Sequence, residues 1–341
     1  MKLKDIELKD ISKFRAEHMG LAMIFIVLFH VGLPRTDMFF GLRRMGNIGV
    51  DIFMFLSGIG LWFSWMKEQN SPAGFVRRWA AFYWRRLKRV YPAWILIAAL
   101  YYVPRFLKHE THTMDQWIDL FGDILINWGF WQHDELTFWY VPAIMMLYVI
   151  APPYMEMVRR WPVYRWMVVL PLMWCVIMQY VTPVHQAVGH IEIFWSRVPI
   201  FLLGINIADS VRTRQSIPGN AIWMILLLFA VSLSACIWLE QMRHGRFPLF
   251  LERMLYIPLT ITSLLLLTRM LEHTPRWFNA AMVWVGGISL EIYLIHSEFV
   301  LKPLSQYHLG YWPTFLATVA ISFPLAYLLQ KTLKMTGLVN K

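Results

Sequence analysis

Two ionisable residues lie inside the first two apolar stretches of the chain or at their edges. His30 follows the apolar run 19–29, and Asp51 lies one turn inside the second run, GNIGVDIFMFLSGIGLWFSW. An ionisable side chain at membrane depth is costly, so it usually faces a protein interior or a wet cavity. Taken alone, His30 is as compatible with a hydrogen bond to a neighbouring helix as with chemistry.

The two residues are expected at similar depth if the two runs are antiparallel helices. At 1.5 Å per residue, His30 lies roughly 22 Å beyond Arg15 along the first helix. A histidine beside a carboxylate is a common arrangement for a general base, because the carboxylate fixes the tautomer and raises the basicity. The alternative is that Asp51 caps its own helix and never touches His30.

The stretch FVRRWAAFYWRRLKRVYPAW, residues 75–94, alternates basic and aromatic residues at nearly helical spacing. One interpretation is a helix that lies on an anionic lipid surface. The other is a phosphate site, because arginine forks bind phosphates in a bidentate manner. Arg86 and Arg89 share one helix face. In the second apolar run, Ser57, Gly58 and Gly60 either permit close helix packing or leave room for a thin ligand.

Further polar groups lie near span ends. Trp139 and Tyr140 begin an apolar segment. They could line a binding site, or they could simply belong to the aromatic belt at the membrane surface. Arg197 needs an anionic or carbonyl partner, and Glu291 and His296 share a later segment. The two cysteines lie in separate apolar segments, which argues against a disulfide framework, and no metal-ligand spacing or phosphate-binding loop is present, so no metal is expected.

The elements that must position these residues are membrane spans. The chain of 341 residues is 58% hydrophobic, well above the roughly 45–50% of soluble domains, and its mean hydropathy is +0.47. The net charge of +11 is therefore attributed to lysine and arginine held on the cytoplasmic side, and not to a nucleic-acid partner. The charged N-terminus is unlike a cleaved signal peptide.

We expect an all-α bundle of about ten transmembrane helices in a single domain, residues 1–341. Most of the 32 lysine and arginine residues fall on one side if both termini are cytoplasmic. Segment 115–131 contains three aspartates and is expected to be interfacial or re-entrant. The expected spans are 14–34, 46–65, 90–106, 137–157, 164–183, 191–208, 218–239, 249–269, 279–300 and 311–332.

Six short motifs follow one another along the chain: LFH at 28–30, GVDIFMFLSG at 49–58, RRLKRVYP at 85–92, the pair Trp139–Tyr140, Arg197 before FLLGI, and ISLEIYLIH at 288–296. Their order resembles the acyltransferase family 3 membrane proteins, which acylate sugars and cell-surface glycans. The resemblance covers nearly the whole chain, and GVDIFMFLSG and RRLKRVYP together, in order and at this spacing, are specific.

The resemblance implies about ten spans, acyl-CoA as the donor, a catalytic histidine at His30 and an Arg-x-x-Arg pair at Arg86 and Arg89. Arg85 and Tyr91 flank that pair and are assigned with it to donor binding. The family's usual first-helix arginine falls on Met19 here, and Arg15, one turn earlier, is the candidate to replace it.

The expected function is a membrane O-acyltransferase that moves an acetyl group from cytoplasmic acetyl-CoA to a sugar hydroxyl of a lipid-linked or surface glycan. His30 would act as general base or hold the acyl group, and we favour the base, with Asp51 beside it. The expected location is the cytoplasmic (inner) membrane of a bacterium, among membrane lipids. The alternatives are a non-enzymatic transporter of a glycan or acyl carrier, and a scaffold for polysaccharide synthesis. The residues assigned to the acceptor are Trp139, Tyr140, Arg197, Glu291 and His296.

Overall fold

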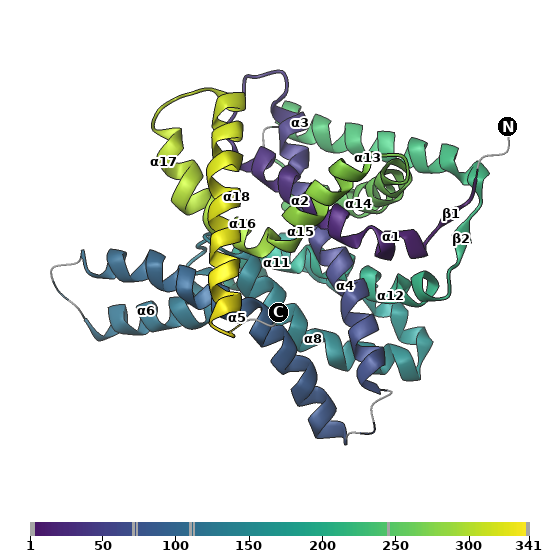
Figure 1. The fold of residues 1–341 in the computed structure, drawn as a ribbon, viewed down its shortest axis with the longest axis horizontal. Helices are drawn as coiled ribbons and strands as arrows, with labels where there is room; N and C mark the ends of the chain where they lie inside the picture. Colours follow the sequence, from purple (N-terminus) through teal and green to yellow (C-terminus); the bar gives the residue numbers. More distant parts are fainter. Residues whose placement is uncertain are drawn as a thin grey trace.

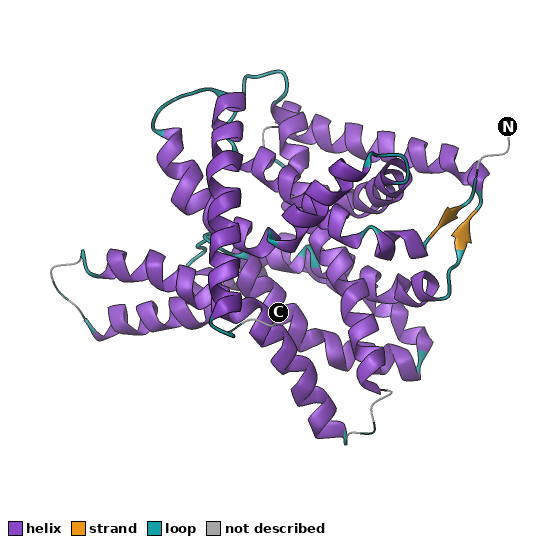
Figure 2. Cartoon of the chain, in the orientation of Figure 1, coloured by secondary structure: helices purple, strands orange, loops and turns teal. Residues whose placement is uncertain are grey.

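The computed structural model describes residues 4–69, 72, 74–108, 111, 113–243 and 246–338. Within these ranges the chain is almost wholly helical, with one two-stranded antiparallel pair between β1 and β2 (Figure 2). The first half contains β1 (Ile6–Glu7), α1 (Lys9–Lys13), α2 (Arg15–His30), α3 (Phe40–Arg44), α4 (Ile48–Gln69), α5 (Phe75–Phe106), α6 (Met114–Ile126), α7 (Trp128–Gln132) and α8 (Tyr140–Arg160).

The second half of the chain is also mainly helical, with several short or broken helices. A π-helix at His296–Leu301 interrupts the last part of the chain. The elements are α9 (Val169–Tyr180), α10 (Thr182–Val188), α11 (Glu192–Trp195), α12 (Val198–Arg212), β2 (Ser216–Ile217), α13 (Ile222–Arg243), α14 (Leu249–Leu271), α15 (Arg276–Gly287), α16 (Ser289–Ile295), α17 (Lys302–Ser305) and α18 (Tyr311–Met335).

Among the described residues, six helices are long and apolar enough to cross a membrane, or eight if each of two bent pairs is one span. The bent pairs are 182–195 with 198–212, and 276–287 with 289–305. The expected count of ten is not confirmed. Helix α2 has 16 residues, about 24 Å, which is shorter than the roughly 30 Å hydrocarbon core. The first half of α5 contains the basic run, which lowers its hydropathy.

Segment 115–131 does not form one continuous span. Asn127 has a left-handed backbone, with φ of 54°, and divides α6 from α7. Thr113 begins α6 with a reciprocal capping box to Gln116. Helix α6 lies alongside the end of α5 and projects from one side of the bundle (Figure 1). Its Trp117 and Phe121 are exposed, as expected of an interfacial helix.

Glycines bring α2 and α4 close to their neighbours. A Cβ at Gly58 would lie 2.3 Å from the carbonyl oxygen of Phe201 on α12, and a Cβ at Gly204 of α12 would lie 2.2 Å from that of Phe55. Gly20 of α2 meets Met282 of α15 in the same way, at 2.2 Å. Such contacts are possible only without side chains, as in small-residue packing between membrane helices. They fix α2 and α4, the helices that hold His30 and Asp51, in the centre of the bundle.

Candidate functional site

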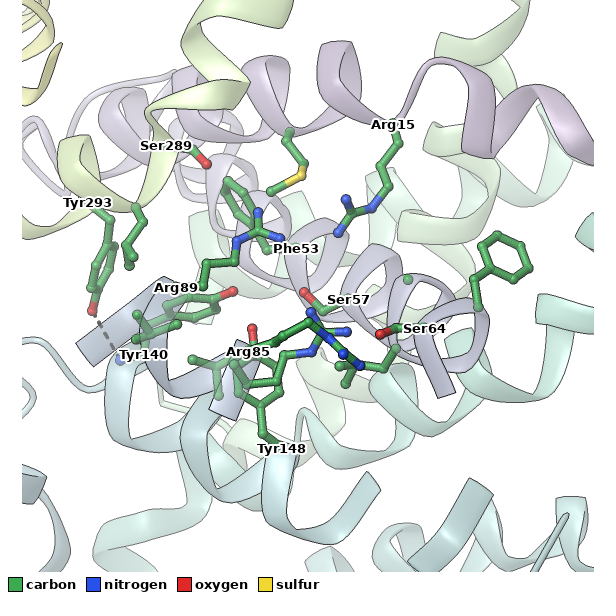
Figure 3. A pocket seen from close by; sticks show the side chains of 18 of the residues that line it. Arg15, Phe53, Ser57, Ser64, Arg85, Arg89, Tyr140, Tyr148, Ser289 and Tyr293 are labelled. Carbon is green, nitrogen blue, oxygen red and sulfur yellow. Dashed lines mark hydrogen bonds between the residues drawn. The ribbon is translucent and has the colours of Figure 1, made fainter. Parts of the chain in front are cut away.

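A cavity of about 510 Å³ lies between α2, α4, α5, α8 and α16. One part of its wall is basic and contains Arg15 from α2, Lys67 from α4, and Arg85, Arg86 and Arg89 from α5. Figure 3 shows Arg15 and Arg89 directed into the same space from different helices. The basic run and α2, which are far apart in sequence, therefore line one cavity.

Two of these arginines have a buried nitrogen with neither a hydrogen-bond nor an ion-pair partner among the described residues. The Nε atoms of Arg15 and Arg86 are buried without a hydrogen bond, whereas Arg85 pairs with Glu68 at 2.7 Å. Gly60 makes room for Arg15, because a Cβ there would lie 3.2 Å from Arg15 Nη2. Buried donors are nearly always satisfied in proteins, so this cluster suits an anionic ligand such as a phosphate.

Aromatic side chains form another part of the cavity wall, which we call the aromatic end. Phe53, Tyr140 and Tyr293 line it, together with Ile26 from the middle of α2. The backbone N–H of Tyr140 donates to the hydroxyl of Tyr293 at 3.1 Å, and the two rings lie 5.3 Å apart (Figure 3). Ser57 of α4 also lines the cavity. The small residues of α4 thus serve both packing, at Gly58, and the cavity, at Ser57 and Gly60.

His30 and His296 lie side by side just beyond the aromatic end. Their ring centroids are 4.9 Å apart, and Nε2 of His296 is 3.2 Å from Nδ1 of His30. Tyr293 connects them to the cavity, since its ring centroid is 6.0 Å from that of His296. His296 is 1% exposed and begins the π-helix, a distortion that is frequent at functional sites.

The neighbouring carbonyls define the tautomers of both rings. Nδ1 of His296 is 2.9 Å from the carbonyl oxygen of Ile292 and 3.0 Å from that of Tyr293, so this nitrogen must hold a proton and donate it. Nε2 of neutral His296 is then an acceptor. Nδ1 of His30 lies 2.9 Å from the carbonyl oxygen of Ile26 and must also be the protonated nitrogen, shared between Ile26 and His296. The remaining nitrogen of His30, Nε2, is left with a free lone pair.

Asp51 does not lie with His30 in this arrangement. It is 1% exposed, and its carboxylate is 3.7 Å from Nε of Arg197, which is itself fully buried. Arg197 also donates to Asn47 Oδ1 at 3.0 Å and lies over the ring of Trp139, at 4.7 Å. The expected histidine–carboxylate pair is therefore replaced by a histidine pair, and Asp51 balances the charge of the buried arginine.

Further buried charged residues, which the motifs did not reveal, lie elsewhere in the bundle. Glu252 and Arg253 pair at 3.6 Å, Tyr256 donates to Glu252 at 3.0 Å, and Arg44 pairs with Glu240 at 2.8 Å. Glu240 and Glu252 each interrupt or border a long apolar segment, and that position was a usable signal. Tyr148, Ser289 and Tyr293 also line the cavity; they carry no charge that would single them out in an apolar segment, but Ser289 and Tyr293 fall within the motif ISLEIYLIH.

Two other predicted residues lie away from the cavity wall. The hydroxyl of Tyr91 donates to the carbonyl oxygen of Leu125 at 3.0 Å, towards α6. Glu291 accepts from the side chain of Gln330 at 3.4 Å. Neither lines the cavity, whereas the basic residues Arg15, Arg85, Arg86 and Arg89 and the aromatic Tyr140 do. Within the described ranges, no group of three or more histidine, cysteine or carboxylate side chains could hold a metal ion.

Comparison with known proteins agrees with the motif order. Residues 20–331 match the model of an acyltransferase domain, Acyl_transf_3. The chain is also 28% identical over 187 residues to the regulator of hypoxia-inducible factor 1 of Caenorhabditis elegans; the match covers 46% of this chain and 35% of that protein. The match thus spans about a third of the length of the curated relative. No solved structure matches the chain.

Proposed function

The chain belongs to the acyltransferase family 3 of membrane proteins, and on that premise we propose that it transfers an acetyl group from acetyl-CoA to a sugar hydroxyl of a lipid-linked or surface glycan. The observation that supports this best is the cavity that joins a cluster of arginines, partly without partners, to an aromatic end beside two paired histidines.

Coenzyme A binds with its phosphates at the basic end. Arg15, Arg86 and Arg89 project there from two helices, and their forks match phosphate oxygens. In the proposed orientation both termini and this end of the cavity face the cytoplasm, where acetyl-CoA is made. Met19, which also lines the cavity, takes the place of the family's usual arginine, and Arg15 reaches the same space from one turn away.

The pantetheine arm follows the cavity and presents the thioester at the aromatic end. Ile26, at this end, lies one helical turn before His30 on α2, which corresponds to about 6 Å along the helix axis. Tyr293 lines the cavity and its ring centroid is 6.0 Å from that of His296, so rotation of this ring would open the path for transfer. The acceptor approaches from the opposite face, where His30 is half-buried.

His30 Nε2 removes the proton from the acceptor hydroxyl as the oxygen attacks the thioester carbonyl. The new C–O bond forms, the C–S bond breaks, and the departing thiolate takes the proton back from His30, which gives the acetyl ester and free CoA. His296 accepts a hydrogen bond from Nδ1–H of His30 and so keeps Nε2 in the basic form. Asp51 and Arg197 pair with each other, which stabilises this end of the bundle, and they do not contact His30.

Mass spectrometry of surface glycans, from cells with and without the gene, tests the proposal. Loss of acetyl esters in the deletion, restored by the wild-type gene, is expected. A transporter would instead change the amount of glycan at the surface and leave its acetylation unchanged, and that result would reject the enzymatic proposal.

A further inference from the structure

A second concave site lies at the His30 end of the bundle, and its wall is dominated by arginine. It is lined by Arg35 and Thr36 from the segment after α2, and by Gln241, Met242, Arg243 and Arg246 at the end of α13 and just beyond it. All three arginines are exposed. None of them has a carboxylate partner among the residues that the structure describes.

Hydrogen bonds and close helix packing hold the two parts of the site together, and we call these contacts its frame. The side chain of Gln241 accepts from the N–H of Gly41 at 2.7 Å and donates to the carbonyl oxygen of Asp37 at 3.0 Å. A Cβ at Gly41 would lie 2.6 Å from the carbonyl oxygen of Ile237, so α3 lies directly against α13. These contacts hold the segment after α2 against the end of α13, the two parts of the chain from which Arg35 and Arg243 line one depression.

The acidic side chains beside the site form no ion pair with Arg35, Arg243 or Arg246 among the described residues. The carboxylate of Asp37 accepts from the N–H of Phe39 at 2.8 Å, and Glu240 pairs with Arg44. Three guanidinium groups around one depression, without neutralising partners, repel one another and attract anions. Each offers the planar fork that suits a carboxylate or a phosphate.

The frame also joins this site to the histidine pair. Arg43 of α3 donates to the carbonyl oxygens of Phe29 at 2.6 Å and Val31 at 3.0 Å, the two residues that flank His30. Arg35 follows His30 by five residues, so their Cα atoms are at most about 18 Å apart. A sugar with an anionic group bound at the arginines can therefore place a hydroxyl one or two sugar units away at His30.

We propose that this depression binds an oxyanion of the acceptor, so that the protein acetylates a glycan with a carboxylate or phosphate group. The inference rests on the proposed function and adds the substrate class. It also assigns a role to arginines that the proposed orientation puts on the outer face, where basic residues are a minority.

Binding to the purified protein in neutral phosphatidylcholine nanodiscs tests the inference, with glucuronate, glucose 1-phosphate and glucose as probes. Both anions should bind, with an affinity that falls as salt rises, and glucose should not. The triple variant Arg35→Gln, Arg243→Gln, Arg246→Gln should weaken anion binding at least tenfold, and the corresponding lysine variant should restore part of it. Arg105→Gln, which alters an arginine stacked on Tyr101 outside this site, should bind as wild type does.

Acetyl-CoA binding, measured on the same samples, separates this inference from the proposed function. Normal acetyl-CoA binding without anion binding, or with equal anion binding to wild type and the triple glutamine variant, would overturn the inference alone. If the wild-type protein does not bind acetyl-CoA, that result would contradict the proposed function instead. Nanodiscs that contain phosphatidylglycerol identify the source of the anion: complete loss of glucuronate binding there would show that a lipid headgroup fills the site and would also overturn the inference.

Discussion

Replacement of His296 by phenylalanine examines the histidine pair directly. The phenyl ring retains the packing against Tyr293 but offers no acceptor to Nδ1–H of His30, which lies 3.2 Å from His296 Nε2 in the wild type. During transfer His30 becomes an imidazolium, and a hydrogen bond to a charged group contributes roughly 1.5–3 kcal/mol. With one factor of ten per 1.36 kcal/mol, kcat should fall roughly 10- to 150-fold.

The assay is acetyl transfer in proteoliposomes, with affinity for acetyl-CoA measured separately. The affinity should stay near the wild-type value, because Arg15, at the basic end, lies roughly 22 Å from His30 along α2. His296→Gln places an amide oxygen near the former Nε2 and should recover part of kcat. His190→Phe, which removes a hydrogen bond to the carbonyl of Trp131 away from the cavity, is the matched control. Full kcat in His296→Phe would refute the paired-histidine account.

Three other predictions concern donor binding, the buried Asp51–Arg197 pair and the membrane topology. Arg86→Ala and Arg89→Ala should each weaken acetyl-CoA binding by roughly 1.5–3 kcal/mol, and lysine at either position should restore part of the binding. Tyr91→Phe is the control and should leave binding unchanged. If acetyl-CoA binds both alanine variants as it binds the wild type, the basic run is only a lipid anchor. Asp51→Ala leaves Arg197 buried without its anion and should cost about 3–5 kcal/mol, seen as a lower melting temperature of the purified protein, and an unchanged melting temperature would contradict that pairing. A thiol reagent that does not cross membranes should label Thr36→Cys but not Thr213→Cys in intact cells, and the reverse pattern would invert the proposed topology.

The order of motifs was sufficient to predict a helical membrane protein of this family and to single out His30, Arg86 and Arg89. Depth along a helix follows from residue number, so the prediction that Arg15 and His30 lie at opposite ends of α2 needed no coordinates. Which way each side chain points around its helix axis does not follow from one sequence. Asp51 was therefore assigned to His30 although it faces Arg197, and Tyr91 was assigned to the donor although it faces α6.

The span count shows a similar limit. Apolar runs predict spans, but α2 is shorter than the hydrocarbon core and α5 begins with charged turns. Breaks such as the one between α15 and α16, with a 61° bend, divide runs that look continuous in hydropathy. Ser71, in the loop after α4 that is also expected on the cytoplasmic side, lies outside the described residues, so Thr213 is the position chosen for the labelling experiment.

Acetyl transfer by the His30→Ala variant tests the central claim most directly. The protein should remain inserted and bind acetyl-CoA with nearly wild-type affinity, because the phosphate-binding arginines are separate from His30. The rate of transfer from acetyl-CoA to the acceptor in proteoliposomes should fall by roughly 10²–10⁴-fold, the usual cost of losing a general base. A stable, inserted His30→Ala protein that transfers acetyl groups at the wild-type rate would remove His30 from the mechanism.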